Sequence, residues 1–199
     1  MGQKPVEVNL DLEAVEAAAA RGHALDFPRT AISDAIDALV SAFHLVINWI
    51  WVLLMLLIVI NVTLRYYFGT NYIAMEEMQW HLFAIGWMVG LAYAVKLDGH
   101  VRVDVLADRY RPRTRAWIEL LGLLVFLLPL CGIMLYWGWP FVLRAWTINE
   151  VSAAPGGLPA RWAIKSVILL GFGLLGLAAL SRLLRVTALL FGLPRPLRA

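Results

Sequence analysis

The sequence predicts an all-α integral membrane protein with four transmembrane helices, an N-terminal amphipathic helix leading into the first of them, and both termini in the cytoplasm. Three observations support this fold class. Of the 199 residues, 61% are apolar and 16% are charged, whereas soluble domains approach one half and one quarter. Four apolar runs are each long enough to supply the ~20 residues that cross a bilayer. The Lys and Arg residues gather mostly on one side of these runs.

Three segments divide the chain: an acidic N-terminal segment (1–32), a four-helix membrane domain (33–191) and a cytoplasmic tail (192–199). The Ala-rich block at 14–20 favours helix, so we expect a short cytoplasmic surface helix or a poorly ordered tail there. The segment lacks a basic stretch followed by an apolar run and a cleavage site, and we therefore expect no cleaved signal peptide.

The amphipathic lead-in begins near residue 33. Its apolar positions recur at helical spacing: Ile32, Ile36, Leu39, Val40 and Phe43. Asp34 and Asp37 fall on another face and suit a helix N-terminus, where the helix dipole favours anions. We expect this helix to run directly into the first span.

The four spans are expected at about 44–66, 73–96, 116–146 and 160–183. The first is uncharged over 45–64 and closes on three aromatic residues, after which Gly69 breaks the helix. The third is longer than a crossing requires, so it must tilt, kink at Pro129 or Pro140, or project beyond the lipid. Pro159 is well placed near the start of the fourth.

The distribution of Lys and Arg predicts the orientation. Residues 1–44 hold three of them, the loop at 96–115 holds six and residues from 181 onward hold four. The opposite side holds Arg65, Arg144, Arg161 and Lys165. The positive-inside rule therefore places both termini in the cytoplasm. The net charge of +3 is small and follows the loops, so we expect membrane lipid and no nucleic acid as a partner.

Small residues form two stripes that would let another helix approach closely. Gly86, Gly90 and Ala94 recur at i, i+4 and i+8 in the second span, and Gly173 and Gly176 form a looser stripe in the fourth. The neighbouring helix belongs either to this chain or to a partner, and packing within the chain is the commoner use.

Two adjacent carboxylates, Glu76 and Glu77, lie in the first turns of the second span. A carboxylate within the membrane suggests proton or cation coupling. Here the helix dipole favours an anion, and Arg65 lies just across the short turn. We therefore favour a structural ion pair that anchors the ends of the two helices.

The histidines raise the alternative of a respiratory membrane anchor that holds haem between two helices. On the predicted topology, His44 lies at the cytoplasmic edge and His81 about 12 Å deep from the other side, at 1.5 Å per residue. In a hydrocarbon core about 30 Å thick, these two histidines are roughly 18 Å apart along the membrane normal, which is too far to ligate one iron. His23 and His100 lie outside the spans. We expect no cofactor and no metal site in this chain.

No nucleotide-binding loop, nucleophilic triad or HExxH pattern occurs, and no soluble part is large enough to bind a substrate alone. We therefore expect that this protein is not an enzyme. Besides the respiratory anchor, one alternative remains: a small stand-alone transporter that couples ions through Glu76 or Glu77.

Five short sequence features lie between residues 33 and 190. They are RYYFG (65–69), the pair Glu76 and Glu77, the run from Trp87 and Gly90 into GHVRVDVL (99–106), NEVS (149–152) and LPARW (158–162). GHVRVDVL after an apolar helix is the most specific of them. Together they resemble the small membrane subunit, the Q type or DctQ-like subunit, of tripartite ATP-independent periplasmic (TRAP) transporters.

This resemblance implies a multi-pass subunit of the bacterial inner membrane that associates with a large membrane subunit. The large subunit resembles an elevator transporter and carries the substrate and sodium sites. A periplasmic substrate-binding protein captures the substrate, often an organic acid, and docks on both membrane subunits. The small subunit is expected to enlarge the static scaffold against which the elevator moves.

On the same resemblance, three sets of charged or polar residues have expected roles. The outer ends of the first two spans would be held together by Arg65, Glu76 and Glu77. The conformation of the cytoplasmic loop would be fixed by His100, Arg102 and Asp104. A face for the binding protein, where rim charges chiefly tune encounter rates, would be formed by Arg144, Glu150, Arg161 and Lys165.

Overall fold

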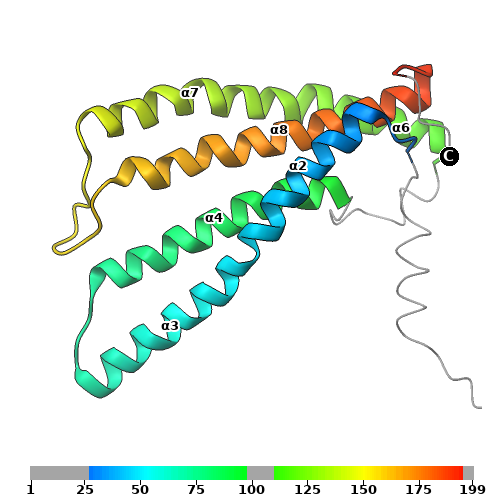
Figure 1. Ribbon diagram of the computed structural model, residues 1–199. Helices are drawn as coiled ribbons and strands as arrows, with labels where there is room; N and C mark the ends of the chain where they lie inside the picture. The colour runs from blue at the N-terminus through cyan, green and yellow to red at the C-terminus, as the bar shows by residue number, and fades with distance from the viewer. Residues whose placement is uncertain (1–26, 98–109, 195–199) are drawn as a thin grey trace, which may run out of the picture.

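The computed structural model describes residues 27–97 and 110–194, and all regular structure in these ranges is helical (Figure 1). The helices are α2 (Ala31–Ile47), α3 (Trp49–Phe68), α4 (Ile73–Leu97), α6 (Pro112–Leu121), η1 (Gly122–Leu127), α7 (Leu128–Thr147) and α8 (Arg161–Phe191). Within the described ranges, four stretches are long and apolar enough to cross a membrane: Ala31–Phe68, Ile73–Leu97, Arg113–Thr147 and Arg161–Phe191. The prediction of an all-helical protein with four membrane-spanning helices is confirmed.

The first apolar stretch consists of two helices that meet at Asn48, and α2 and α3 differ in direction there (Figure 1). A capping box starts α2, because the Thr30 hydroxyl accepts a hydrogen bond from the Ser33 amide (3.2 Å) and the Ser33 hydroxyl accepts one from the Thr30 amide (3.1 Å). Gly69 ends α3 in the left-handed region at φ 63°, a conformation that glycine adopts without strain.

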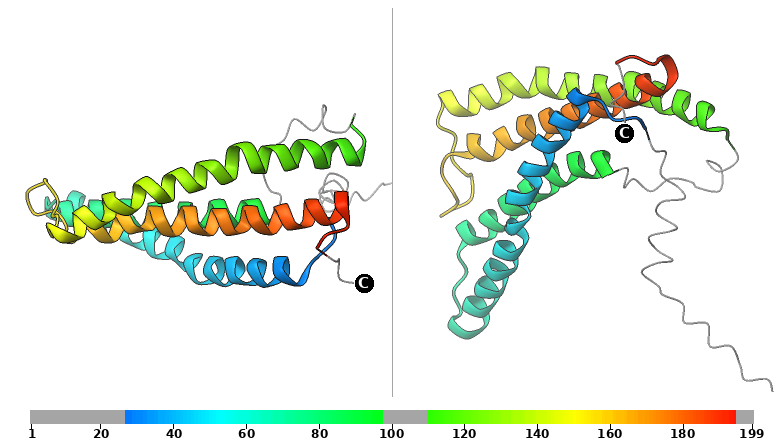
Figure 2. Two further views of the ribbon diagram at one scale, coloured as in Figure 1. Left: turned by 90° about the horizontal axis from the view of Figure 1, so that it is seen from above. Right: turned by 45° about the vertical axis from the view of Figure 1, so that its right-hand side comes forward.

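Helix α8 is the centre of the bundle. It packs against α2, α4, α6 and α7, whereas α3 packs chiefly against α4. Figure 2 shows α3 leaving the bundle at an angle, with its far end well away from α8. Most large apolar side chains of α3 are consequently exposed, and its buried residues are Leu54 and Asn61.

Two apolar clusters hold the helices on α8. The first joins α4, α7, α2 and α8 through Val89, Ala92, Val95, Cys131, Val40, Leu174, Leu175 and Ala178. The second joins α6 and η1 to the later part of α8 through Ala116, Leu120, Leu123, Ala179 and Val186, with Phe27 against them. Both clusters lie away from α3, so the close packing is concentrated around one helix.

The third spanning stretch is continuous through both of its prolines, with a π-helical segment, η1, directly before Pro129. Proline has no amide hydrogen, so the ordinary bond back to Val125 is absent. The amide of the preceding residue, Leu128, bonds to the Leu123 carbonyl five residues earlier. The helix thus passes Pro129 by locally widening rather than by ending.

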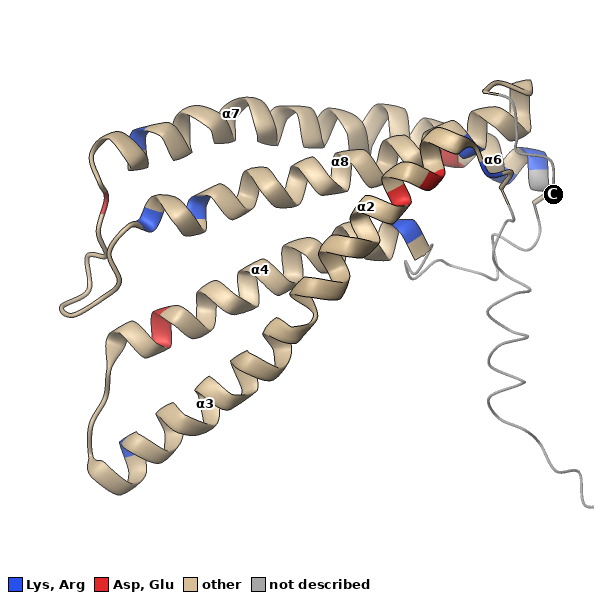
Figure 3. Ribbon diagram, viewed as in Figure 1, with Lys and Arg blue, Asp and Glu red and all other residues tan. Residues whose placement is uncertain are grey.

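Charged side chains of the described residues collect at the two ends of the bundle (Figure 3). We call the end with the α3–α4 turn and the α7–α8 loop the loop end. The other end, where α2 begins and α8 finishes, is the terminal end (Figure 1). The first and last described residues lie together at the terminal end, as four crossings require.

One feature of α2 differs from the sequence-based expectation. Ser33 and Asp37 are buried on the face toward α8, whereas Ile32 and Leu39 are 58% and 45% exposed. The expected apolar stripe is therefore only partly the packed face. The Asp37 carboxylate can be buried because α8 supplies hydrogen-bond donors to it.

Candidate functional site: polar clusters at the two ends of the bundle

At the loop end, Glu77 joins α4 to the loop between α7 and α8. Its carboxylate accepts hydrogen bonds from the Leu158 amide (2.6 Å) and from the Ser152 hydroxyl. The Ser152 amide in turn donates to the Leu158 carbonyl (3.1 Å), which closes the loop. A Cβ on Gly157 would lie 2.5 Å from the Ser152 Cβ and 3.0 Å from a Glu77 oxygen, so this packing requires glycine.

A second ion pair secures the same loop. Lys165 on α8 pairs with Glu150, and the Arg161 amide donates to the Glu150 carbonyl (2.9 Å). The Lys165 ammonium also lies 4.2 Å from the Phe141 ring centre. Two of the four residues predicted to face a binding protein are thus bonded to one another.

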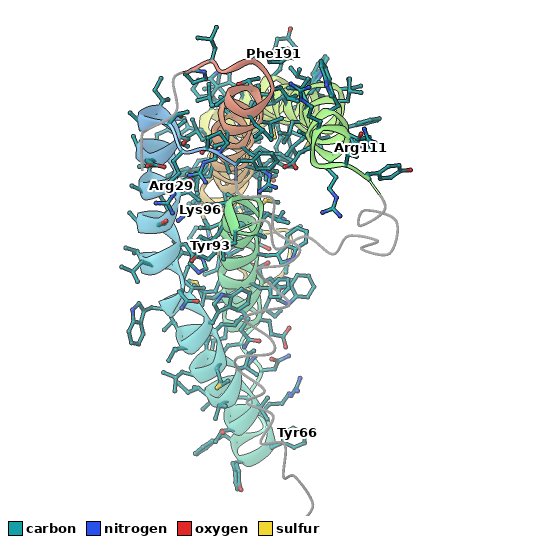
Figure 4. All side chains as sticks on the ribbon, turned by 90° about the vertical axis from the view of Figure 1, so that its right-hand side faces the viewer. Arg29, Tyr66, Tyr93, Lys96, Arg111 and Phe191 are labelled. Carbon is teal, nitrogen blue, oxygen red and sulfur yellow. The ribbon has the colours of Figure 1, made fainter. Side chains whose placement is uncertain are left out.

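Arg65 does not pair with Glu76 or Glu77 in the described part of the chain. It is exposed in the last turn of α3, with its guanidinium 5.7 Å from the Tyr66 ring centre. Donors from the α7–α8 loop, which sequence reasoning missed, bond Glu77 instead. Figure 4 shows Tyr66 at the far tip of the molecule, remote from Tyr93 and Lys96 near the other end of α4.

A pocket of about 400 Å³ opens beside Glu77, between the first turns of α4 and the start of α8. Its lining combines carboxylates, a guanidinium, an imidazole and apolar side chains: Ile73, Glu76, Glu77, Trp80, His81, Arg161 and Ile164. It brings together Glu76, Glu77 and Arg161, which the sequence assigned to separate roles.

At the terminal end, Asp37 is the centre of a cluster that locks α2 onto α8. Its carboxylate accepts hydrogen bonds from the Ser181 hydroxyl (2.7 Å) and from the Arg185 guanidinium. Arg185 also reaches Asp34 (3.2 Å) and the Ser33 hydroxyl (3.2 Å), and Ser181 donates to the Ser33 carbonyl (3.2 Å) as well. We call these residues the terminal-end clamp.

Sequence reasoning counted Arg185 only toward orientation. The available signal was spacing: Ser181 and Arg185 stand at i and i+4 in the later part of α8, and Asp34 and Asp37 at i and i+3 in α2.

Two further contacts tie the other helices to the terminal end. Arg182 pairs with Glu119, joining α8 to α6, and both side chains are almost fully buried, at 11% and 12% exposed. Lys96 donates to the Ser41 hydroxyl, joining α4 to α2. The clamp is thus part of a polar layer that crosses the bundle.

The predicted glycine stripes have mixed surroundings. A Cβ on Gly86 would lie 2.9 Å from the Trp51 ring, so α3 approaches α4 closely there, whereas nothing lies within 4 Å of one on Gly90. Ala94 is half-buried. Gly173 also has open space, and Gly176 faces Cys131 at 3.6 Å.

Two close approaches that the stripes did not predict involve Gly138 and Gly171. An added Cβ would lie 2.9 Å from Leu169 at Gly138 and 2.8 Å from Met88 at Gly171. Close helix contacts therefore follow the packing around α8 rather than the regular spacing of small residues.

The two described histidines have separate surroundings. His44 stacks on the Tyr93 ring with ring centres 3.7 Å apart, while His81 lines the loop-end pocket. Among the described residues, no group of three or more His, Cys, Asp and Glu side chains is placed to hold a metal ion. His100, Arg102 and Asp104 lie outside the described residues.

Four membrane-spanning helices, with charges confined to their ends and bonded across helices, define a small multi-pass membrane protein. A sequence model of the DctQ component of tripartite ATP-independent periplasmic transporters matches residues 54–189. The chain belongs to this family, and it is a small TRAP transporter subunit. The family is a transporter component and not an enzyme family. A comparison with curated proteins found no match.

Proposed function

We propose that this subunit is a static scaffold beside a large, elevator-type membrane subunit. The complex would carry out sodium-coupled uptake of an organic acid delivered by a periplasmic binding protein. It would lie in the bacterial inner membrane with both termini of this chain in the cytoplasm. The substrate and sodium sites would lie in the large subunit, so this chain would bind no cofactor.

One observation carries the scaffold role. In the described spans, Asp, Glu, Lys and Arg are absent from the middle of every helix, and those near the ends mostly bond to other helices or to loops. A proton or ion path across these spans would need a connected series of ionisable groups at intermediate depth, whereas the imidazoles of His44 and His81 have separate surroundings. The charges therefore fasten helices together, as a rigid support requires.

The exposed surface of α3 supports a large membrane partner. Its apolar side chains include Met55 at 68% exposed and Val59 at 57%, and α4 is its main neighbour in the chain. Such a surface suits either lipid or a second membrane protein. Membership of a family of transporter components favours the second membrane protein.

At the loop end, we propose that Arg144, Glu150, Arg161 and Lys165 meet the binding protein. Since Lys165 and Glu150 are bonded to each other, their main contribution would be to shape the loop. Arg144, in the last turn of α7, would then act mainly through encounter rate.

Co-isolation from native membranes tests the proposal directly. A tagged full-length chain should bring down a larger multispanning protein from gently solubilised membranes. In proteoliposomes, uptake should require both membrane subunits, the binding protein and a sodium gradient. Consistent isolation of the chain alone, or uptake by this chain without the large subunit, would contradict the scaffold role.

The docking face has its own test. Charge reversal of Arg144 should slow association of the binding protein with the complex and make it less sensitive to salt. An unchanged association rate and salt dependence would remove Arg144 from the docking face.

A further inference from the structure

The loop-end pocket contains two charged groups of opposite sign, Glu76 and Arg161, without a hydrogen-bonded partner among the described residues, although Arg161 is close enough to Glu77 and His81 to interact with them electrostatically. Glu77 is held by Ser152 and Leu158, but in the described part of the chain no hydrogen bond or ion pair reaches the Glu76 carboxylate or the Arg161 guanidinium. Both side chains are partly buried, which makes unpartnered charge costly. A ligand that carries an anion and a cation a few bonds apart would satisfy both.

The start of α8 strengthens the attraction for an anion beside Arg161. The helix begins at Arg161, and no side chain caps it. The Arg161 and Ala163 amides are already bonded to the carbonyls of Glu150 and Ala160, so it is the helix dipole that adds partial positive charge next to the guanidinium. On the opposite wall, Glu76 and Glu77 favour a cation, so the pocket is polarised across its width.

A second hollow of about 460 Å³ adjoins the pocket and shares Trp80 with it. It lies between α3 and α4 and is lined by Leu54, Ile58, Gln79, Trp80 and Phe83. The Gln79 amide donates to the Leu57 carbonyl (3.5 Å), which leaves the groove mainly apolar. A polar pocket and an apolar groove therefore share one wall, at Trp80.

The order of these surfaces along the helices matches the polarity of a bilayer. Residues 73–81 of α4 cover about 12 Å at 1.5 Å per residue, which is the depth of a headgroup layer and the top of the hydrocarbon. Ile58 and Leu54 lie ten and fourteen residues before the end of α3 at Phe68, and so about 15 and 21 Å deeper. Polar groups are outermost and apolar groups lie deeper.

We propose that this composite site binds one phospholipid with a primary ammonium headgroup, for which phosphatidylethanolamine is the probe. The phosphate would face Arg161, the ammonium would donate hydrogen bonds to Glu76, and one acyl chain would lie along the groove over Trp80. Phosphatidylglycerol offers no cation to Glu76. Phosphatidylcholine has a quaternary ammonium that donates no hydrogen bond.

A side chain of the binding protein is the competing occupant. The groove favours lipid, because it extends along α3 and α4 into membrane-spanning surface that a soluble protein does not reach. The proposal does not rest on the scaffold role, but it assigns the Arg161 guanidinium to lipid and leaves the docking face to the other three residues proposed above.

Native mass spectrometry of the full-length chain tests the site, with the three lipids supplied in equal amounts in mixed micelles. Phosphatidylethanolamine adducts should exceed those of each other lipid by about tenfold, the value of one charged hydrogen bond. Glu76→Gln should abolish most of this preference, whereas Arg161→Gln should weaken the binding of all three lipids, because each carries the phosphate. Arg144→Gln removes a charge at the same end but outside the pocket, and it should leave the preference unchanged.

Three results would overturn the proposal. Equal retention of the three lipids by the unmodified chain would exclude headgroup selection, whether or not the variants fold. Binding of soluble phosphoethanolamine as tightly as the lipid would assign the pocket to a free small molecule. An unaltered amount of bound lipid in Arg161→Gln, together with loss of binding-protein association, would assign the guanidinium to docking.

Discussion

Replacement of Asp37 by alanine should loosen α2 from α8 more than any other single truncation in the terminal-end clamp. The Asp37 side chain is 11% exposed and accepts hydrogen bonds from Ser181 and Arg185. Removing it deprives both donors of one acceptor at a buried site, and Ser181 keeps only the Ser33 carbonyl among the described residues. Arg185 retains Asp34 and Ser33, so its charge is not left wholly unpaired.

The expected cost lies between two limits. Hydrogen bonds to a charged group contribute about 1.5–3 kcal/mol each, whereas polar contacts between membrane helices average only ~0.6 kcal/mol. Two such bonds, partly compensated at Arg185, give about 2 kcal/mol for Asp37→Ala. In a double-mutant cycle with Arg185→Met, the coupling energy should be about 1 kcal/mol.

Equilibrium unfolding in mixed detergent micelles, followed by tryptophan fluorescence, measures these free energies. Asp34→Ala is the matched control, because that carboxylate is 36% exposed and 3.2 Å from the same guanidinium. Its cost should be about 0.5 kcal/mol. If Asp37→Ala costs no more than Asp34→Ala, or if the coupling with Arg185 is near zero, the clamp does not fasten α2 and the reasoning fails.

Three other predictions address the loop end and the packing on α8. Glu77→Ala should destabilise the protein by about 2 kcal/mol and Glu77→Gln by less, since the amide keeps one acceptor oxygen; equal thermal unfolding of the two variants would contradict this. Gly171→Ala should cost about 1–3 kcal/mol, whereas Gly173→Ala, two residues on in open space, should be neutral or slightly stabilising, and reversal of that order in the same melts would refute the packing. Charge reversal of Glu150 or Lys165 alone should make the loop more sensitive to protease, and the double reversal should restore resistance; equal cleavage of all forms would show that the pair does not hold the loop.

The number of spans followed from the sequence, because a helix needs an apolar run of about 20 residues to cross the hydrocarbon core. Gly69 was recognisable as a helix end for a similarly local reason, since only its own backbone conformation is involved. Properties that depend on one stretch of chain were therefore accessible from the sequence.

The packed faces were less accessible. Lipid is as apolar as Leu or Ile, so a pattern of apolar residues does not say which face contacts another helix. On α2 the buried face contains Asp37 and Ser33, and the exposed face contains Ile32. The partners of Asp37 are about 145 residues away along the chain, and spacing within α2 carries no information about them.

One part of the loop-end site was predictable from the sequence. Glu77 was singled out because a carboxylate in a span needs a partner, and Glu77 is hydrogen-bonded in the structure. The partner was expected to be the nearest cation in sequence, Arg65. The structure instead supplies a backbone amide and a hydroxyl from the α7–α8 loop, a solution that no charge pattern reveals.

The position of α3 has a mechanical consequence. Its near end is continuous with α2, which the clamp fixes to α8, while the rest of it packs chiefly against α4 within the described chain. Because α3 rests mainly on one neighbouring helix, a change in bilayer thickness should alter its tilt before it disturbs the packing around α8. The width of this subunit in the plane of the membrane would then vary with the surrounding lipid, even while its core stays constant.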